Sequence, residues 1–141
     1  MTEYICSGTF ELGPMYDDLG NQLEGIQGSE GATGIVDDGW SEFEMGLDHI
    51  VMKPGTQFPL HTHPGSHILY ILDGPGIVHI EGVDYQVFTG DSVFVPAVFP
   101  HGVKTEPSHM RDFRFLAVGY PHHKVDSTTR CLLYTSDAAD E

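Results

Sequence analysis

The sequence predicts an all-β domain, and three observations carry this prediction. The 141 residues include 17 glycines and 9 prolines, which leave few stretches long enough for an ordinary helix. Hydrophobic residues make up 40% of the chain, enough to bury the core of one domain. From Trp40 onward, short alternating runs are separated by Gly, Pro or Asp. We therefore expect about eight to ten strands in a sandwich or a small barrel.

The first long strand is expected at residues 43–51, where apolar and polar residues alternate. The face that we expect to be buried is formed by Phe43, Met45, Leu47, His49 and Val51. The other expected strands are the runs at residues 58–63, 67–74, 76–82, 84–88, 91–96, 101–105 and 112–119. No tandem repeat relates these runs, and 141 residues are the length of one domain.

We expect this single domain to span residues 1–130. Residues 20–39 hold six glycines and four acidic residues without periodicity, which predicts a loop or a lid. Trp40, the only tryptophan, follows this segment and is interpreted either as a lid residue over a pocket or as a packing residue.

The last eleven residues, 131–141, read CLLYTSDAADE. They resemble the in-frame translation of a sequencing-library adapter, an artefact of metagenomic gene prediction that suggests a bacterial metagenome as the source. An ordinary polar tail is the alternative. In either case the composition predicts a disordered segment without structural contacts.

The charge balance limits the partners of this chain. Six basic residues oppose 21 acidic ones, for a formal net charge of −15, so nucleic acid and anionic membranes are expected to be repelled. A small neutral or apolar molecule, or a cation, fits better. Two cysteines, at positions 6 and 131, form no disulfide framework, and no apolar run is long enough to span a membrane. We expect a cytoplasmic protein.

Histidine is the unusual component, with nine residues, and four of these fall in two short windows. His61 and His63, at positions i and i+2, would share one face of a strand, and a turn at Pro64 and Gly65 would bring His67 beside them. His101 would arrive from a separate hairpin. Four imidazoles suit zinc, nickel, copper or iron(II) and are poor ligands for calcium or magnesium.

The two windows spell G-x5-H-x-H-x3-H-x6-G from Gly55 to Gly74 and G-x5-P-x-V-x2-H from Gly90 to His101. They resemble the two motifs of the cupin superfamily, over about residues 45–118. The resemblance implies a cupin, jelly-roll-like β-barrel holding one divalent transition metal through His61, His63, His67 and His101. Zinc is the preferred metal, with iron, nickel, copper and manganese as alternatives.

Three positions depart from the cupin pattern: His67 stands where Glu is usual, Val98 where Gly is usual, and Thr105 where Asn is usual. Four neutral imidazoles leave a divalent ion with its full +2 charge, which favours Lewis-acid chemistry over oxygen activation. The fourth histidine is similar to the site of the small cupin-fold cyclases of aromatic polyketide biosynthesis.

Further residues are candidates for a pocket above the metal. His49 is interpreted either as a catalytic proton shuttle or as a buried structural histidine. The residues that would line the pocket, or simply fill the barrel, are Trp40, Met45, Leu47, Leu69, Ile71, Phe113 and Phe115. No carboxylate is expected inside the pocket.

Three functions therefore remain open. The first is a Lewis-acid enzyme that cyclises, isomerises or dehydrates a carbonyl-rich or aromatic compound, resembling the polyketide cyclases. The second is a non-haem iron dioxygenase of quercetinase type, and the third is a metal- or ligand-binding cupin without turnover. We also expect a homodimer, in which a strand near residues 3–11 crosses to the partner.

Overall fold

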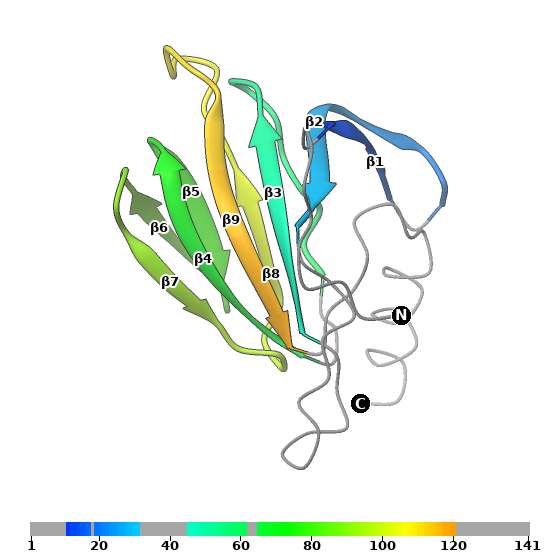
Figure 1. The fold of residues 1–141 in the computed structure, drawn as a ribbon. Helices are drawn as coiled ribbons and strands as arrows, with labels where there is room; N and C mark the ends of the chain where they lie inside the picture. The colour runs from blue at the N-terminus through cyan, green and yellow to red at the C-terminus, as the bar shows by residue number, and fades with distance from the viewer. Residues whose placement is uncertain (1–10, 18, 32–44, 62–64, 121–141) are drawn as a thin grey trace.

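The computed structural model describes residues 11–17, 19–31, 45–61 and 65–120, and within these ranges the chain forms strands and no helix (Figure 1). The all-β prediction is therefore confirmed. The strands are β1 (Gly13–Tyr16), β2 (Gln22–Glu30), β3 (Gly46–Met52), β4 (Ser66–Asp73), β5 (Gly76–Ile80), β6 (Val83–Val87), β7 (Ser92–Val95), β8 (His101–Lys104) and β9 (Phe113–Tyr120).

The strands form two antiparallel layers (Figure 1). One sheet has the order β1-β2-β3-β9-β4-β7 and the other the order β6-β5-β8. The last strand, β9, therefore lies between β3 and β4, which requires a long crossover of the jelly-roll kind. Because the two sheets are separate in their hydrogen bonding, the described strands form a sandwich rather than a closed barrel.

The hydrophobic core lies between the two sheets. Pairing within the larger sheet aligns Ile50 of β3, Phe115 of β9 and Ile71 of β4 in one row across its inner face. All three side chains are buried and belong to one cluster. The smaller sheet adds Val78 and Val87 from the opposite side. This packing brings together strands that are far apart in the sequence.

Strand β3 presents the opposite face to the core from the one expected, so that part of the sequence prediction is wrong. Asp48, Ile50 and Met52 face the interior, and Met45, Leu47 and His49 belong to the outer face. Apolar alternation gave the wrong face because both faces of β3 carry apolar residues. Val51, on the outer face, is as buried as Ile50. Pairing with β9 decides which face points inward, since a shift by one residue exchanges the faces.

Two further expectations need correction. Residues 22–30, expected to be part of a loop, form β2, which pairs with β1 and β3. The strand escaped notice because its buried positions include Gly28 and Ser29 beside Ile26, so it has little apolar periodicity. Within residues 57–61, a regular strand is replaced by two isolated bridges, at Gln57 and His61. The runs expected from residue 67 onward match β4 to β9.

Gly76, at the start of β5, is packed against the ring of Phe113 so closely that a methyl group would collide with it. That ring is fully buried and touches Phe115, so it cannot turn aside. We predict that Gly76→Ala lowers the free energy of unfolding by about 1–3 kcal/mol, measured by urea denaturation. Gly13→Ala is the control, because its nearest neighbour would be 4.0 Å away. Equal unfolding midpoints for the two variants would contradict the prediction.

Candidate metal centre

Three of the four predicted ligands lie in the described part of the chain, and the fold brings them together at one end of the sandwich. His67 stands on β4 of the larger sheet, and His101 begins β8 of the smaller one. The ring centroids of His61 and His101 are 4.4 Å apart, and those of His67 and His101 are 6.2 Å apart. The fourth, His63, lies outside the described residues, as does Trp40.

Backbone pairing fixes His61 against His101. The N–H of each donates a hydrogen bond to the carbonyl oxygen of the other, at 2.9 Å in both directions. A Cβ at Gly102, the next residue along β8, would come within 3.1 Å of the Phe58 carbonyl oxygen, so a side chain there would push the two segments slightly apart. The segment that carries His61 therefore lies flat on β8, which holds the two imidazoles side by side.

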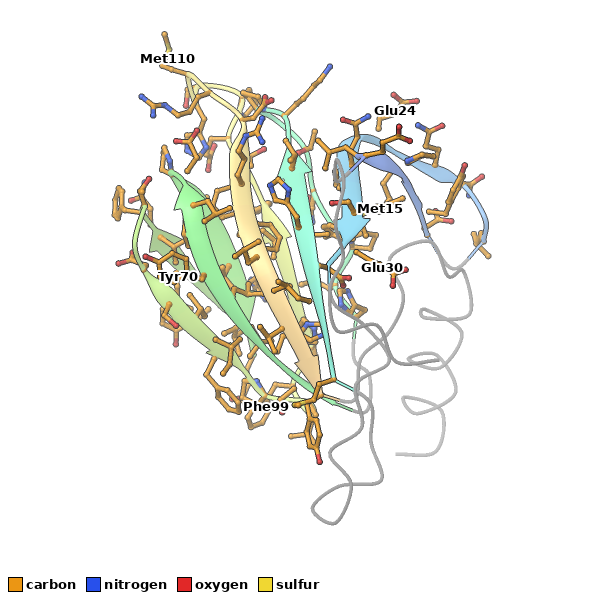
Figure 2. All side chains as sticks on the ribbon, in the orientation of Figure 1. Met15, Glu24, Glu30, Tyr70, Phe99 and Met110 are labelled. Atoms are coloured by element: carbon orange, nitrogen blue, oxygen red, sulfur yellow. The ribbon has the colours of Figure 1, made fainter. Side chains whose placement is uncertain are left out.

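Each of these two imidazoles is oriented by a backbone carbonyl two residues earlier. The Nδ1 atom of His61 lies 2.7 Å from the Pro59 oxygen, and that of His101 lies 2.9 Å from the Phe99 oxygen (Figure 2 labels Phe99). A carbonyl oxygen only accepts, so Nδ1–H donates in both bonds. In the neutral rings Nε2 then carries the lone pair, which is the arrangement found in metal-binding histidines.

The donor chemistry of this cluster fits a borderline transition metal. Imidazole nitrogens suit zinc, copper, iron and nickel. His101 is buried, whereas His61 and His67 are half-buried. Within the described ranges, however, no three His, Cys, Asp or Glu side chains already form a finished metal-binding group. The case for a metal therefore depends on the chemistry and orientation of the imidazoles.

A buried carboxylate faces the same interior and was missed by the sequence reasoning, which expected none. Asp48 is only 2% exposed and pairs with Ala117 of β9, which pairs in turn with Leu69 of β4. Asp48 is thus two strand spacings, roughly 10 Å, from Leu69. His67 is the next inward residue along β4. The reversed face of β3 explains the omission.

Small residues lie between the carboxylate and the histidine. The inward positions of β9 at this end are Ala117 and Gly119, so no large side chain of β9 separates Asp48 from His67. Glu30 pairs with Asp48 across β2 and β3 and is half-buried (Figure 2 labels Glu30). The end of the sandwich that holds the histidines therefore also carries acidic groups on its inner face.

The proposed pocket residues divide into two groups. Leu69, Ile71, Phe113 and Phe115 are buried on the inner face, as expected. The rings of Phe113 and Phe115 are 5.2 Å apart and pack in the core, and Leu69 is the member nearest His67 in the register. Met45 and Leu47 belong to the outer face, which does not support a role inside the sandwich. Whether the inner residues contact a ligand remains a prediction.

His49 also belongs to the outer face, opposite Ser29. Its Nε2 atom and the Ser29 hydroxyl are both buried, and neither has a hydrogen-bond partner among the described residues. Burial lowers the pKa of His49 below its ordinary value of 6.5, and the positive charge of Arg114 lowers it further. The ring is therefore neutral at pH 7. Its position does not support the proton-shuttle hypothesis for a pocket between the sheets.

Comparison with known proteins places the chain in a family. The Cupin domain model matches residues 48–119, and we conclude that the chain belongs to the cupin family. No helix in the described ranges is long and apolar enough to cross a membrane.

Two curated proteins are similar over 68 residues, which is 48% of this chain. The oxalate-binding protein of Thermotoga maritima is 37% identical over 54% of its length, and dimethylsulfoniopropionate lyase DddW of Ruegeria pomeroyi is 31% identical over 45%. The matches thus span about half of each relative. The structure of the polyketide cyclase RemF from Streptomyces resistomycificus has a TM-score of 0.61 at 20% identity, covering 83% of this chain and 79% of that one. This last likeness supports the fold alone.

The lowered pKa of His49 gives a test of its burial. The folded state disfavours the imidazolium, so protonation in the unfolded chain destabilises the fold as the pH falls below 6.5. We predict that, as the pH falls from about 7.5 to 5.5, the free energy of unfolding decreases less for His49→Gln than for the wild type. Urea denaturation with a chelator present measures this without metal release, and His109→Gln is the control. Equal acid sensitivity of wild type and His49→Gln would contradict the prediction.

Proposed function

We propose that this cupin holds one divalent transition metal, preferably zinc, through His61, His63, His67 and His101. When bound, the ion supplies Lewis-acid polarisation of a carbonyl group. We further propose that the protein isomerises, cyclises or dehydrates a small carbonyl-rich or aromatic compound. Asp48 is the group that exchanges the proton in this scheme.

The observation that carries the proposal is the orientation of His61 and His101 by backbone carbonyls. A histidine whose Nδ1–H is bonded to a carbonyl has a fixed tautomer, which leaves Nε2 as the acceptor. Here two rings from separate segments have the same tautomer. Each Nδ1–H is donated to a carbonyl, and each Nε2 is left as the acceptor. His67 extends this arrangement from the opposite sheet, with its ring near that of His101.

The charge of the interior favours a neutral substrate. Four imidazoles add no negative charge, so the acidic character of the site comes from Asp48 and Glu30 on the inner face. With the +2 charge of a bound ion, these two groups bring the formal charge of the site to about zero, which suits a neutral ketone or phenol. A weak carbon acid also needs a group that accepts its proton. Asp48, which no large side chain of β9 separates from His67, is suited to that role.

Apolar residues complete the surroundings. Leu69 and Ala117 lie in the same inner row as Asp48 and are themselves buried. They limit access of water, which would otherwise compete for the proton and weaken electrostatic interactions with the substrate. The combination of a basic group, a cluster of imidazoles and an apolar wall is typical of proton transfer at carbon.

A binding protein without turnover is the second candidate. The specific observation in its favour is the 37% identity to an oxalate-binding protein. The dioxygenase hypothesis is less favoured, because neutral ligands make a ferrous ion harder to oxidise. An oxygen electrode with flavonol and diketone substrates distinguishes it from Lewis-acid chemistry.

His67 is the residue with which to test the metal site. Loss of an outer-shell partner weakens metal binding about 10- to 100-fold, and we predict that His67→Ala weakens zinc binding by at least that much, because a direct bond is lost while the other imidazoles remain. His67→Glu should retain the metal, since it restores the ligand set of three histidines and one glutamate that is usual in cupins. It should lower the rate of the proposed proton-transfer reaction. Zinc titration by calorimetry and metal analysis measure the affinity, and His109→Ala, in the loop after β8, is the control. Unchanged zinc affinity in both His67 variants would exclude His67 as a ligand.

Asp48→Asn tests proton transfer separately from metal binding. We predict unchanged zinc affinity and a loss of at least about 100-fold in exchange of carbon-bound hydrogen for deuterium. Proton NMR of a panel of methyl ketones and diketones in deuterated buffer measures the exchange rate of the zinc-loaded protein. Glu106→Gln, at an exposed loop position, is the control. Exchange that is catalysed equally by wild type and Asp48→Asn would remove Asp48 from the mechanism.

A further inference from the structure

The segment that carries His61 contains one residue too many for regular pairing with β8. At one end, the Phe58 N–H donates to the Val103 carbonyl oxygen at 2.8 Å. At the other end, His61 pairs with His101 through two hydrogen bonds of 2.9 Å. Two residues lie between Phe58 and His61, whereas β8 has only one between Val103 and His101. A strand in which two residues face one residue of its neighbour forms a β-bulge.

The bulge consists of Pro59 and Leu60, and it faces Gly102 of β8. Proline has no N–H for a ladder, so within a sheet it is confined to edges, strand starts and bulges. Space for the extra residue comes from the glycine. A Cβ on Gly102 would lie 3.2 Å from Cδ2 of Leu60 and 3.5 Å from the Pro59 carbonyl oxygen. The bulge thus occupies the space that a side chain at this position of β8 would take.

The bulge decides which side chain reaches the interior. A regular ladder continued from Phe58 would place Leu60 opposite His101, and residues opposite each other share a face. His101 is buried, with its ring 6.2 Å from that of His67 on the other sheet. Leu60 would therefore point inward and His61 outward. In the structure the reverse holds, because Leu60 is 53% exposed and the ring of His61 lies 4.4 Å from that of His101.

The bend of the chain also explains the hydrogen bond of the His61 ring. Side chains of an extended strand stand perpendicular to the sheet, whereas its carbonyl groups point sideways toward neighbouring strands. A ring in such a strand does not reach the carbonyl two residues earlier. At a bulge the ladder is disrupted, and here the Pro59 oxygen lies 2.7 Å from Nδ1 of His61. One local irregularity thus gives His61 both its face and its tautomer.

We propose that the Pro59–Leu60 bulge is a positioning element of the metal centre. Leu60 is the extra residue that turns His61 to the interior, and Gly102 is the residue that leaves room for it. Bulges beside functional sites re-aim side chains in this way. The inference deepens the proposed function, because it concerns how one proposed ligand comes to face the site. The contact between the rings of His61 and His101 involves no ion, so it can be measured in metal-free protein.

Gly102→Val tests the space that the bulge requires. Valine adds a Cβ and two methyl groups where Leu60 and the Pro59 carbonyl now lie, so it favours a regular ladder. We predict that the nuclear Overhauser effect between the ring protons of His61 and His101 is lost in the metal-free variant. The zinc affinity, measured by calorimetry, should fall at least about 10-fold, because one proposed ligand is turned away. 

Gly13→Val on β1 is the matched control, since the nearest atom to a Cβ there would be 4.0 Å away, and it should keep both properties. Deletion of Leu60 in the Gly102→Val background should rescue the ring contact, because a regular ladder then places His61 opposite His101. Zinc affinity should recover only to about 10-fold below that of the wild type, since the carbonyl bond to Nδ1 is not restored. General damage to the fold would not be repaired by a deletion.

Deletion of Leu60 from the otherwise unchanged chain is the second variant if Gly102→Val fails to fold, which circular dichroism reveals. It should keep the contact between His61 and His101, and loss of that contact would overturn the proposal. So would a Gly102→Val protein that retains both the contact and the zinc affinity, or a contact that does not return when Leu60 is also deleted. Ring contacts as predicted in every variant, without zinc binding by the wild type, would refute the proposed function and still support the positioning role of the bulge.

Discussion

The antiparallel pairing of β9 with β3 on one side and β4 on the other is the interaction on which the rest of the structure depends. It joins residues 46–52, 66–73 and 113–120, which are far apart in the sequence, into the centre of one sheet. Because side chains alternate between faces, this register assigns every residue of the three strands to the interior or the exterior. This register places Asp48, His67 and the core residues of the three strands on the inner face.

A second constraint acts locally at the histidine cluster. His61 and His101 each follow a proline-containing segment, and each is held by the carbonyl two residues earlier. The two segments also bond to each other through their backbones. The same hydrogen bond from Nδ1–H to a carbonyl therefore occurs in both segments, and backbone pairing places the two segments side by side. This arrangement orients the imidazoles before any ion binds, which reduces the ordering required on binding.

The two faces of β4 lie in different surroundings, one in the interior and one exposed. His67, Leu69 and Ile71 face the interior, where imidazole gives way to apolar packing along a single strand. Ile68, Tyr70 and Leu72 face outward and are apolar as well. One face is covered by the smaller sheet, and the sequence of the other is as hydrophobic as if it too were covered. The strand that presents His67 to the interior thus also presents exposed apolar side chains on its outer face.

Much of this protein could be predicted from its sequence. Glycine, proline and period-two patterns predicted an all-β fold and most strands from β4 onward, because turn residues and alternation are local properties. Histidine spacing predicted that His61, His67 and His101 would come together. The face of β3 could not be predicted, since Val51 and Ile50 are equally apolar and neighbours decide between them. Strand β2 was missed because Ile26 is its only large, fully buried apolar side chain, while Gly28 and Ser29 occupy its other buried positions. The interior position of Asp48 depends on the register with β9, a contact between distant segments, and only the tertiary structure could decide it.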